Sequence, residues 1–309
     1  MVGMVPIRYV RSKQGTFRQS SAALTWGKTT AGDSMRISVS HETVYSYETA
    51  AAGVIQTLRL TPRNHEGQYV VGWRIDLSAD CRLKQHEDAF GNITHSFSAE
   101  GPFATLGVAV EGEVETQDTH GVIRGSVERF PPSLFLRETR LTHADPPIID
   151  FARDVQADSG NDVLKLLHGL LTRLHEGIAY DLDPTHVATT AAEAFAAKRG
   201  VCQDLTHIFV AASRSLGIPA RYVGGYLHRT DGVVRQEAGH AWAEAFVPHL
   251  GWVGFDSANG ICPTEAHVRV AVGLDYLGAA PIRGARIGGG HEALGVKVVV
   301  DQAGRQSQN

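Results

Sequence analysis

The first third of the chain alternates apolar and polar residues with the period of two that is typical of β-strands. The segment from Asp88 to Asn92 reads Asp-Ala-Phe-Gly-Asn and supplies glycine and asparagine where a hairpin turn needs positive φ. We therefore expect the flanking strands to pair across it. Together these patterns predict a β-rich domain over residues 35–116. The predicted strands cover residues 37–47, 55–60, 69–77, 82–86, 93–97 and 105–114.

The second half of the chain changes to the three- and four-residue spacing of helices with one apolar face. Thr190 and Glu193 have the spacing of a capping box, which marks the start of one helix. Another begins near Cys202 and ends before the Gly217-Ile-Pro219 turn. The predicted helices cover residues 163–174, 191–198 and 202–216, and short strands are predicted at 220–227, 241–247 and 252–255.

These elements predict an α+β protein in which a β-rich N-terminal domain precedes a core of helices packed on an antiparallel sheet. Residues 117–147 contain two Pro-Pro pairs and show weak patterning, so we interpret them as a connector. The core is then expected over residues 148–282, followed by a C-terminal strand and tail over residues 283–309.

Residues 1–34 lack periodicity and carry a charge of +4, whereas the rest of the chain carries −8. We expect a disordered extension or a mis-annotated start, with Met35 as the true first residue. A basic targeting or binding tail is the alternative.

Composition and charge narrow the class of protein. The 309 residues carry a net charge of −4, and 43% of them are hydrophobic, as in ordinary globular proteins. There is no basic excess for nucleic acid, no apolar run that spans a bilayer and no signal-like stretch. The three cysteines, Cys81, Cys202 and Cys262, lack the close spacing of a zinc or redox motif. We therefore expect a cytoplasmic protein that binds neither nucleic acid nor membranes.

Cys202 is the first candidate for chemistry, because the first turn of a helix offers unpaired N–H groups and a positive dipole end that favour thiolate over thiol. His240 opens a predicted strand, and Asp256 follows the next one. Two adjacent antiparallel strands would bring these two side chains together. A Cys-His-Asp set of this kind is suited to nucleophilic acyl transfer, with the aspartate orienting the imidazole.

The sequence around these residues resembles the core of the bacterial transglutaminase-like superfamily. The resemblance extends through RVAVGLDY at 269–276, while HETVYSY, LRLTPR and DAFGN resemble the β-rich N-terminal domain that accompanies this core. The motifs of the core are GVCQDLTH at 200–207, SLGIPARYVGGY at 215–226, GHAWAEA at 239–245 and GWVGFD at 251–256.

The resemblance implies a papain-like α+β core with Cys202 as nucleophile, His240 as base and Asp256 as the orienting partner of the histidine. The chain departs from many relatives at Ser257-Ala258, where they have Pro-Thr, and this concerns only the local turn. The chemistry would form a thioester on Cys202 from a peptide or glutamine amide. The Cys202 backbone N–H would meet the oxyanion together with a second donor that the sequence does not identify.

Three outcomes share this thioester: crosslinking to an amine, deamidation and proteolysis. We expect hydrolysis of a peptide or amide bond in a peptide or protein substrate, because a cytoplasmic enzyme that crosslinked indiscriminately would damage the proteins around it. A protein-glutamine gamma-glutamyltransferase, a deamidase and a non-catalytic peptide-binding module are the alternatives. No cofactor is needed, and the short Asp181-Leu-Asp183 segment is no calcium loop. No His/carboxylate cluster at ligand spacing predicts a metal site. The oligomeric state is not predicted.

Other residues near these motifs have weaker assignments. Tyr222, Gly224 and Trp252 are candidates to line the substrate cleft, although strand aromatics are more often core residues. His207 is expected to pack or to cap rather than to bind metal. Asp204 is expected to accept hydrogen bonds from the backbone at the start of its helix, with a direct role in the site as the alternative.

Overall fold

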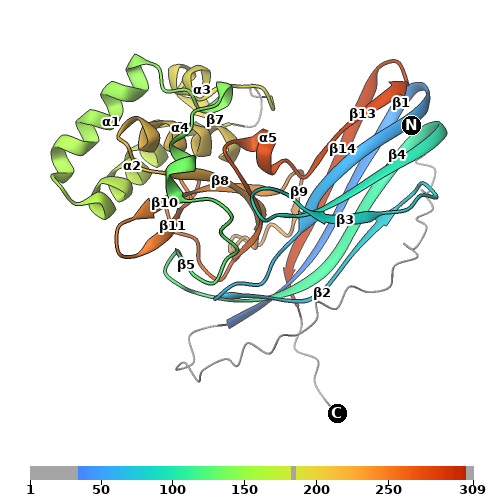
Figure 1. Cartoon of the computed structure of the whole chain (residues 1–309), viewed down its shortest axis with the longest axis horizontal. Helices are drawn as coiled ribbons and strands as arrows, with labels where there is room; N and C mark the ends of the chain where they lie inside the picture. The colour runs from blue at the N-terminus through green and yellow to red at the C-terminus, as the bar shows by residue number, and fades with distance from the viewer. Residues whose placement is uncertain (1–33, 182–185, 304–309) are drawn as a thin grey trace, which may run out of the picture.

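The computed structural model describes residues 34–181 and 186–303. A helical half lies beside a long curved sheet, as Figure 1 shows. The expectation of a disordered or mis-annotated extension concerns residues that almost all lie outside the described part of the chain. Met35 itself lies in the first strand, where it is opposite Thr116. Among the described residues, no helix is long and apolar enough to cross a membrane.

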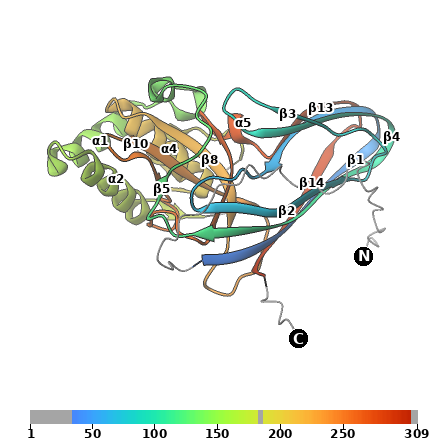
Figure 2. The same cartoon turned by 60° about the horizontal axis from the view of Figure 1, so that its bottom comes forward.

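The curved sheet is formed by strands from both ends of the chain. Its main path is β2-β4-β1-β14-β9, with β13 also pairing with β1 and β3 with β4, all antiparallel. Figure 2 shows these strands extending away from the helices. The strands are β1 Ser34–Thr61, β2 Gln68–Leu77, β3 Lys84–Glu87, β4 Ile93–Gln117, β9 Arg235–Gln236, β13 Ile282–Gly288 and β14 Glu292–Gln302.

Two strands are longer than the sequence predicts. β1 joins the predicted strands at 37–47 and 55–60, and β4 joins those at 93–97 and 105–114. Alternation fails in the joining segments because several of their side chains are exposed, although Ala51 and Val54 are buried. The two strands keep pairing with each other through register shifts near Ala51. The hairpin around Asp88 is present, since β3 pairs with the start of β4.

The C-terminal segment contributes two strands to this sheet, where the sequence predicts one strand and a tail. β13 pairs with the second half of β1 and β14 pairs with its first half. Val298 and Val300 of β14 are buried in the same core as Ile37 and Val39 of β1. The first domain is therefore completed by the last described residues of the chain.

The helical half packs on a second antiparallel sheet of order β12-β8-β10-β11-β5, so the α+β class is confirmed. Its strands are β5 Val122–Ile123, β8 Ala220–Leu227, β10 His240–Val247, β11 Gly251–Phe255 and β12 His267–Gly273. A parallel pair, β6 Ala179–Tyr180 with β7 Arg199–Gly200, stands apart from it. The helices are α1 Pro146–Ser159, α2 Val163–Gly177, α3 Ala191–Ala197, α4 Cys202–Ser215 and α5 Tyr276–Ala279, with 3-10 turns at Pro132–Leu136 and Arg140–Thr142.

Helix α4 is the centre of this half, and its residues 204–214 are all buried. The predicted connector packs against it. Arg214 donates hydrogen bonds to Phe135 O at 2.8 Å and Thr142 Oγ1 at 2.7 Å, and β5 pairs with β11. The segment 117–147 thus forms one edge of the second sheet and part of its core. Its last Pro-Pro pair opens α1, where proline is tolerated because the first helical N–H groups need no partner.

The two sheets share one apolar core, which fixes the domains relative to each other. Tyr226 of β8 packs in the same cluster as the interior of the curved sheet, and its hydroxyl lies 2.9 Å from His41 Nδ1. Asn92 also exchanges two 2.8 Å hydrogen bonds with the backbone of Val272. Because these polar groups are buried and satisfied, the contact is rigid rather than a hinge.

Candidate active site

Cys202 lies at the first position of α4, as the sequence predicts. Val201 is extended and ends the preceding turn, and its N–H donates to Asp204 Oδ2 at 2.9 Å. Asp204 therefore accepts from the backbone, as expected. A Cβ at Gly200 would lie 2.7 Å from the Asp204 carboxylate, so only glycine allows this close approach. The half-buried Cys202 thiol is held at the positive end of a long buried helix.

His240 and Asp256 meet across two adjacent strands. β10 begins at His240, β11 ends at Phe255, and the two strands are antiparallel with Ala243 opposite Phe255. His240 Nε2 lies 2.7 Å from Asp256 Oδ2. The histidine side chain is 9% exposed and the aspartate is fully buried, so water screens this pair very little. The predicted pairing of these two side chains is present.

The negative charges of Asp256 and Cys202 stabilise a positive charge on His240, which lies between them. Burial lowers the pKa of His240, but the Asp256 carboxylate and the Cys202 thiolate outweigh burial and raise it to about 10. Burial raises the pKa of Asp256, but the facing His240 holds it far below its ordinary value. Because Nε2 of His240 is turned toward Asp256, Nδ1 is the ring nitrogen left to exchange a proton with Cys202.

Two further residues hold Asp256, and the sequence analysis missed both. His267 Nε2 lies 3.2 Å from Asp256 Oδ2, and Asn259 Nδ2 donates to the same oxygen at 2.7 Å. The other carboxylate oxygen accepts from the N–H groups of Ala258 and Asn259. In the sequence, His267 is marked only by its position at the start of the alternating strand β12. The pairing of β12 with β8 is what brings it near the site.

His240, Asp256 and His267 are also the groups that could offer ligand atoms to a cation, since these atoms lie within 4.8 Å of one another. His267 Nδ1 accepts from the Thr264 N–H at 3.1 Å, so its Nε2 carries the proton that faces Asp256. A metal ion would have to displace the proton of each imidazole in a buried position. The donor set fits a hydrogen-bonded array better than a metal centre.

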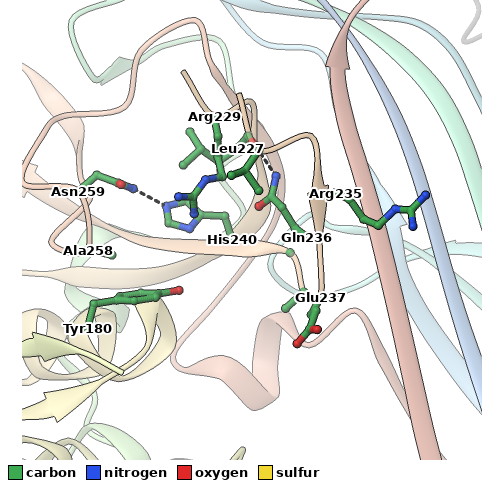
Figure 3. A pocket seen from close by; sticks show the side chains of 12 residues that line it. Tyr180, Leu227, Arg229, Arg235, Gln236, Glu237, His240, Ala258 and Asn259 are labelled. Atoms are coloured by element: carbon green, nitrogen blue, oxygen red, sulfur yellow. Dashed lines mark hydrogen bonds between the residues drawn. The ribbon is translucent and has the colours of Figure 1, made fainter. Parts of the chain in front are cut away.

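A cavity of about 390 Å³ opens over His240. Figure 3 shows Tyr180 on one side of it and Arg229 on the other, with Asn259 beside the imidazole. Val233 and Gln236 of the segment that joins β8 to β10 complete its wall. Because Gln236 belongs to β9 and pairs with Val298 of β14, the curved sheet supports this wall.

The three residues proposed from sequence to line the substrate cleft lie elsewhere, and none lines this cavity. Trp252 is 5% exposed and packs edge-on against Phe135, with the Arg221 guanidinium 3.9 Å over its ring. Tyr222 is 3% exposed, and Gly224 is half-buried within β8. These strand positions face the packed layers rather than the strand ends, where the cavity opens.

His207 packs and caps, as expected. It is fully buried, and its Nε2 accepts from the Tyr276 N–H at 3.1 Å. Burial lowers the pKa of His207 to about 3, so its ring stays neutral. It therefore anchors the start of α5 to α4.

Comparison with known proteins places this geometry in a family. Residues 149–257 match the transglutaminase-like superfamily, and residues 37–115 match the bacterial transglutaminase-like N-terminal region. The part of the chain that carries the candidate site therefore belongs to the transglutaminase-like superfamily. The resemblance seen in the sequence motifs is thereby confirmed.

Relatives of this transglutaminase-like chain match it over very different lengths. An uncharacterized protein of Mycobacterium leprae is 29% identical over 279 residues, which cover 86% of this chain and 98% of the relative. A protein-glutamine gamma-glutamyltransferase of Pseudomonas aeruginosa is 30% identical over 130 residues, covering 38% of this chain and 20% of that protein. The crystal structure of a candidate cysteine protease from Cytophaga hutchinsonii superposes with a TM-score of 0.70 at 18% identity, covering 89% of this chain and 92% of that one. The last likeness shows the shared fold.

Proposed function

We propose that this protein performs thiol-dependent acyl transfer through a thioester on Cys202. The observation that carries the proposal is the position of His240, whose Nε2 is held by Asp256 at 2.7 Å while the Cys202 thiolate stabilises the ring's charge. A buried carboxylate, an imidazole and a thiol at a helix start are the groups that activate a sulfur nucleophile.

In the acylation step, Cys202 Sγ forms a bond to the carbonyl carbon of an amide, and the carbonyl π-electrons move onto its oxygen. When the tetrahedral intermediate collapses, the C–N bond breaks and the amine leaves with a proton from His240 Nδ1. Asp256 stays ionised and holds the imidazole in the required orientation. The products of this step are an amine or ammonia and the thioester.

Hydrolysis of a peptide or amide bond in a peptide or protein substrate is the outcome we favour. The cavity over His240 is open, which gives water access to a thioester formed beneath it. Water would lose a proton to His240 Nδ1 as it attacks the thioester carbonyl, and Cys202 would leave as the thiolate. The whole-length likeness to a candidate cysteine protease supports this choice.

Transfer of the acyl group to an amine is the second candidate. It is favoured by the partial match, over 130 residues, to the Pseudomonas aeruginosa gamma-glutamyltransferase. The chemistry on Cys202 is the same, and only the acceptor differs.

The decisive experiment traps the acyl-enzyme and identifies both what leaves and what accepts. The full chain is incubated with a peptide library in the presence and absence of a fluorescent primary amine, quenched in acid and mapped by mass spectrometry. We expect an acyl adduct on Cys202, absent in Cys202→Ala, together with peptide fragments or ammonia. Amine incorporation in place of hydrolysis would select the transferase. Peptide binding without any adduct would instead support the non-catalytic module.

A further inference from the structure

The Cys202 backbone N–H is one available donor for an oxyanion that forms over the thiol. As the first residue of α4, Cys202 has no acceptor one turn back, and no acceptor is found for its N–H among residues 34–181 and 186–303. Asp204 instead takes the N–H of Val201. A single donor is a weak oxyanion site, and a second is required.

Tyr180 is held beside Cys202 by the backbone. It lies in β6, opposite Gly200 of β7, which is two residues before the thiol. The pairing is fixed on both sides, since Ala179 N–H donates to Lys198 O at 2.9 Å and Asp181 N–H donates to Gly200 O at 3.0 Å. The Tyr180 side chain lines the same cavity as His240, with its hydroxyl turned inward (Figure 3).

The Tyr180 hydroxyl is available as a donor. Within the described part of the chain no hydrogen-bond partner is found for it, although its ring faces the cavity. Burial, and then the charge of the nearby Cys202 thiolate, raise the pKa of Tyr180 to about 12. The phenol thus keeps its proton at any pH at which the thiol chemistry runs. A protonated O–H that the backbone holds in place is the kind of group that stabilises developing charge without reorganisation.

We propose that Tyr180 is a further catalytic residue, whose hydroxyl donates the second hydrogen bond to the oxyanion formed when Cys202 attacks a carbonyl. The inference rests on the proposed function. It completes the site with one backbone donor from α4 and one side-chain donor from β6. No bond to Tyr180 forms or breaks, and its proton stays on the phenol.

The test compares two reactions of Cys202, of which one forms an oxyanion and the other does not. p-Nitrophenyl acetate reacts at a carbonyl: sulfur bonds to carbon, negative charge develops on oxygen and nitrophenolate leaves. Iodoacetamide reacts at a saturated carbon, so sulfur displaces iodide and no oxyanion forms. Both rates are measured on the full chain for the wild type and for Tyr180→Phe. Tyr69→Phe, an exposed tyrosine on β2, serves as the matched control.

We expect Tyr180→Phe to lower the rate of Cys202 acylation by about 10²- to 10³-fold, the usual effect of removing one oxyanion donor. The alkylation rate should stay within about twofold of the wild type, because the thiolate and imidazolium are untouched. The phenylalanine ring keeps the packing of a side chain that is already 54% exposed, so folding should be preserved. The control variant should match the wild type in both reactions.

Two results would overturn the inference. Acylation at the wild-type rate would show that the hydroxyl makes no contact with the oxyanion. Equal loss of acylation and alkylation would show that Tyr180 acts on the thiolate instead. Failure of the proposed function looks different, because the wild-type protein would then show no acyl adduct on Cys202 at all.

Discussion

His267 Nε2 lies 3.2 Å from Asp256 Oδ2, the oxygen that His240 Nε2 approaches to 2.7 Å. The backbone N–H of Thr264 donates to the opposite nitrogen of His267 and thereby fixes the protonated face of the ring. The two histidines differ in role: His240 can exchange a proton with Cys202, whereas His267 is a buried donor to the carboxylate. We infer that His267 positions Asp256.

Replacing His267 by phenylalanine removes one of the donors to a buried carboxylate, and such hydrogen bonds contribute about 1.5–3 kcal/mol. We expect turnover to fall by roughly 10- to 100-fold. The upper limb of the pH profile should also move to lower pH, because a misaligned carboxylate stabilises the His240 imidazolium less. Steady-state rates measured from pH 5 to pH 11 check both effects.

A second variant, His267→Gln, separates positioning from packing. A glutamine amide can replace the Nε2 donor, so the upper limb should return toward the wild-type position. If both variants merely lower the thermal midpoint and leave the pH profile unchanged, His267 is a packing residue.

Asp256→Asn should remove the charge that holds the proton on His240. The pKa of His240 is raised from 6.5 to about 10 in the intact site, so its stabilising contribution is full below pH 6.5 and is lost as the pH rises through 10. In the variant only the Cys202 thiolate still opposes burial, so the imidazolium should be lost at lower pH. We expect turnover to drop by roughly 10³- to 10⁴-fold with the fold intact. Near-native turnover would show that Asp256 does not orient His240, and Asp204 would become the next candidate for this role.

Cys202 should react with alkylating agents ahead of the other two cysteines. Burial raises the pKa of the Cys81 and Cys262 thiols, and neither has a cationic partner in the described structure. A small dose of iodoacetamide at pH 6, followed by peptide mapping, should label Cys202 first and abolish activity in step with labelling. His240→Ala should slow this labelling without stopping it, since the helix dipole remains. Equal labelling of all three thiols would remove the nucleophile assignment.

Glu244 should be a determinant of stability rather than of chemistry. Its fully buried carboxylate accepts from Arg221 at 2.6 Å and from Arg269 at 2.7 Å. Replacing it with glutamine would leave the largely buried Arg269 without its paired carboxylate and Arg221 with Glu128 alone, and we expect a loss of about 3–5 kcal/mol in the free energy of unfolding. Urea denaturation measures this loss. The exposed pair of Arg36 with Glu113 is the control, and Glu113→Gln should change the free energy by about 0.5 kcal/mol or less.

The same carboxylate predicts a direction for acid sensitivity. Burial raises the pKa of Glu244, but Arg269 and Arg221 outweigh burial and lower it to about 2. Because this lies below the ordinary value of 4.5, the ionised group stabilises the fold above pH 4.5, and its contribution is lost as the pH falls toward 2. Stability of the wild type should therefore decline over this window more than that of Glu244→Gln. Parallel pH dependences would contradict the assignment.

The sequence predicted correctly the helix starts, which depend on interactions between residues close together in the chain. The capping box of Thr190 and Glu193 is present, and Cys202 begins its helix, because these depend on residues within one turn. The pairing of His240 with Asp256 followed from two short strands joined by a tight turn.

The features that the sequence did not predict depend on distant partners. His267 reaches Asp256 only because β12 pairs with β8, and Tyr180 reaches the cavity through a two-residue strand without a pattern of its own. The continuous course of β1 is likewise set by pairing with β4 and β14, which outweighs the weak alternation near Ala51. Aromatic strand residues such as Trp252 gave no signal that distinguishes a cleft from a core.

The position of β1 between β4 and β14 has a consequence for synthesis on the ribosome. One side of β1 finds β4 soon after it is made, but the partner of the other side ends at Gln302. At typical elongation rates of 5–20 residues per second, that edge waits for roughly 10 to 50 seconds. During this interval the nascent chain presents an unpaired strand edge to its surroundings, which is a known route to aggregation. Protection of that edge by a chaperone would therefore raise the yield of folded protein.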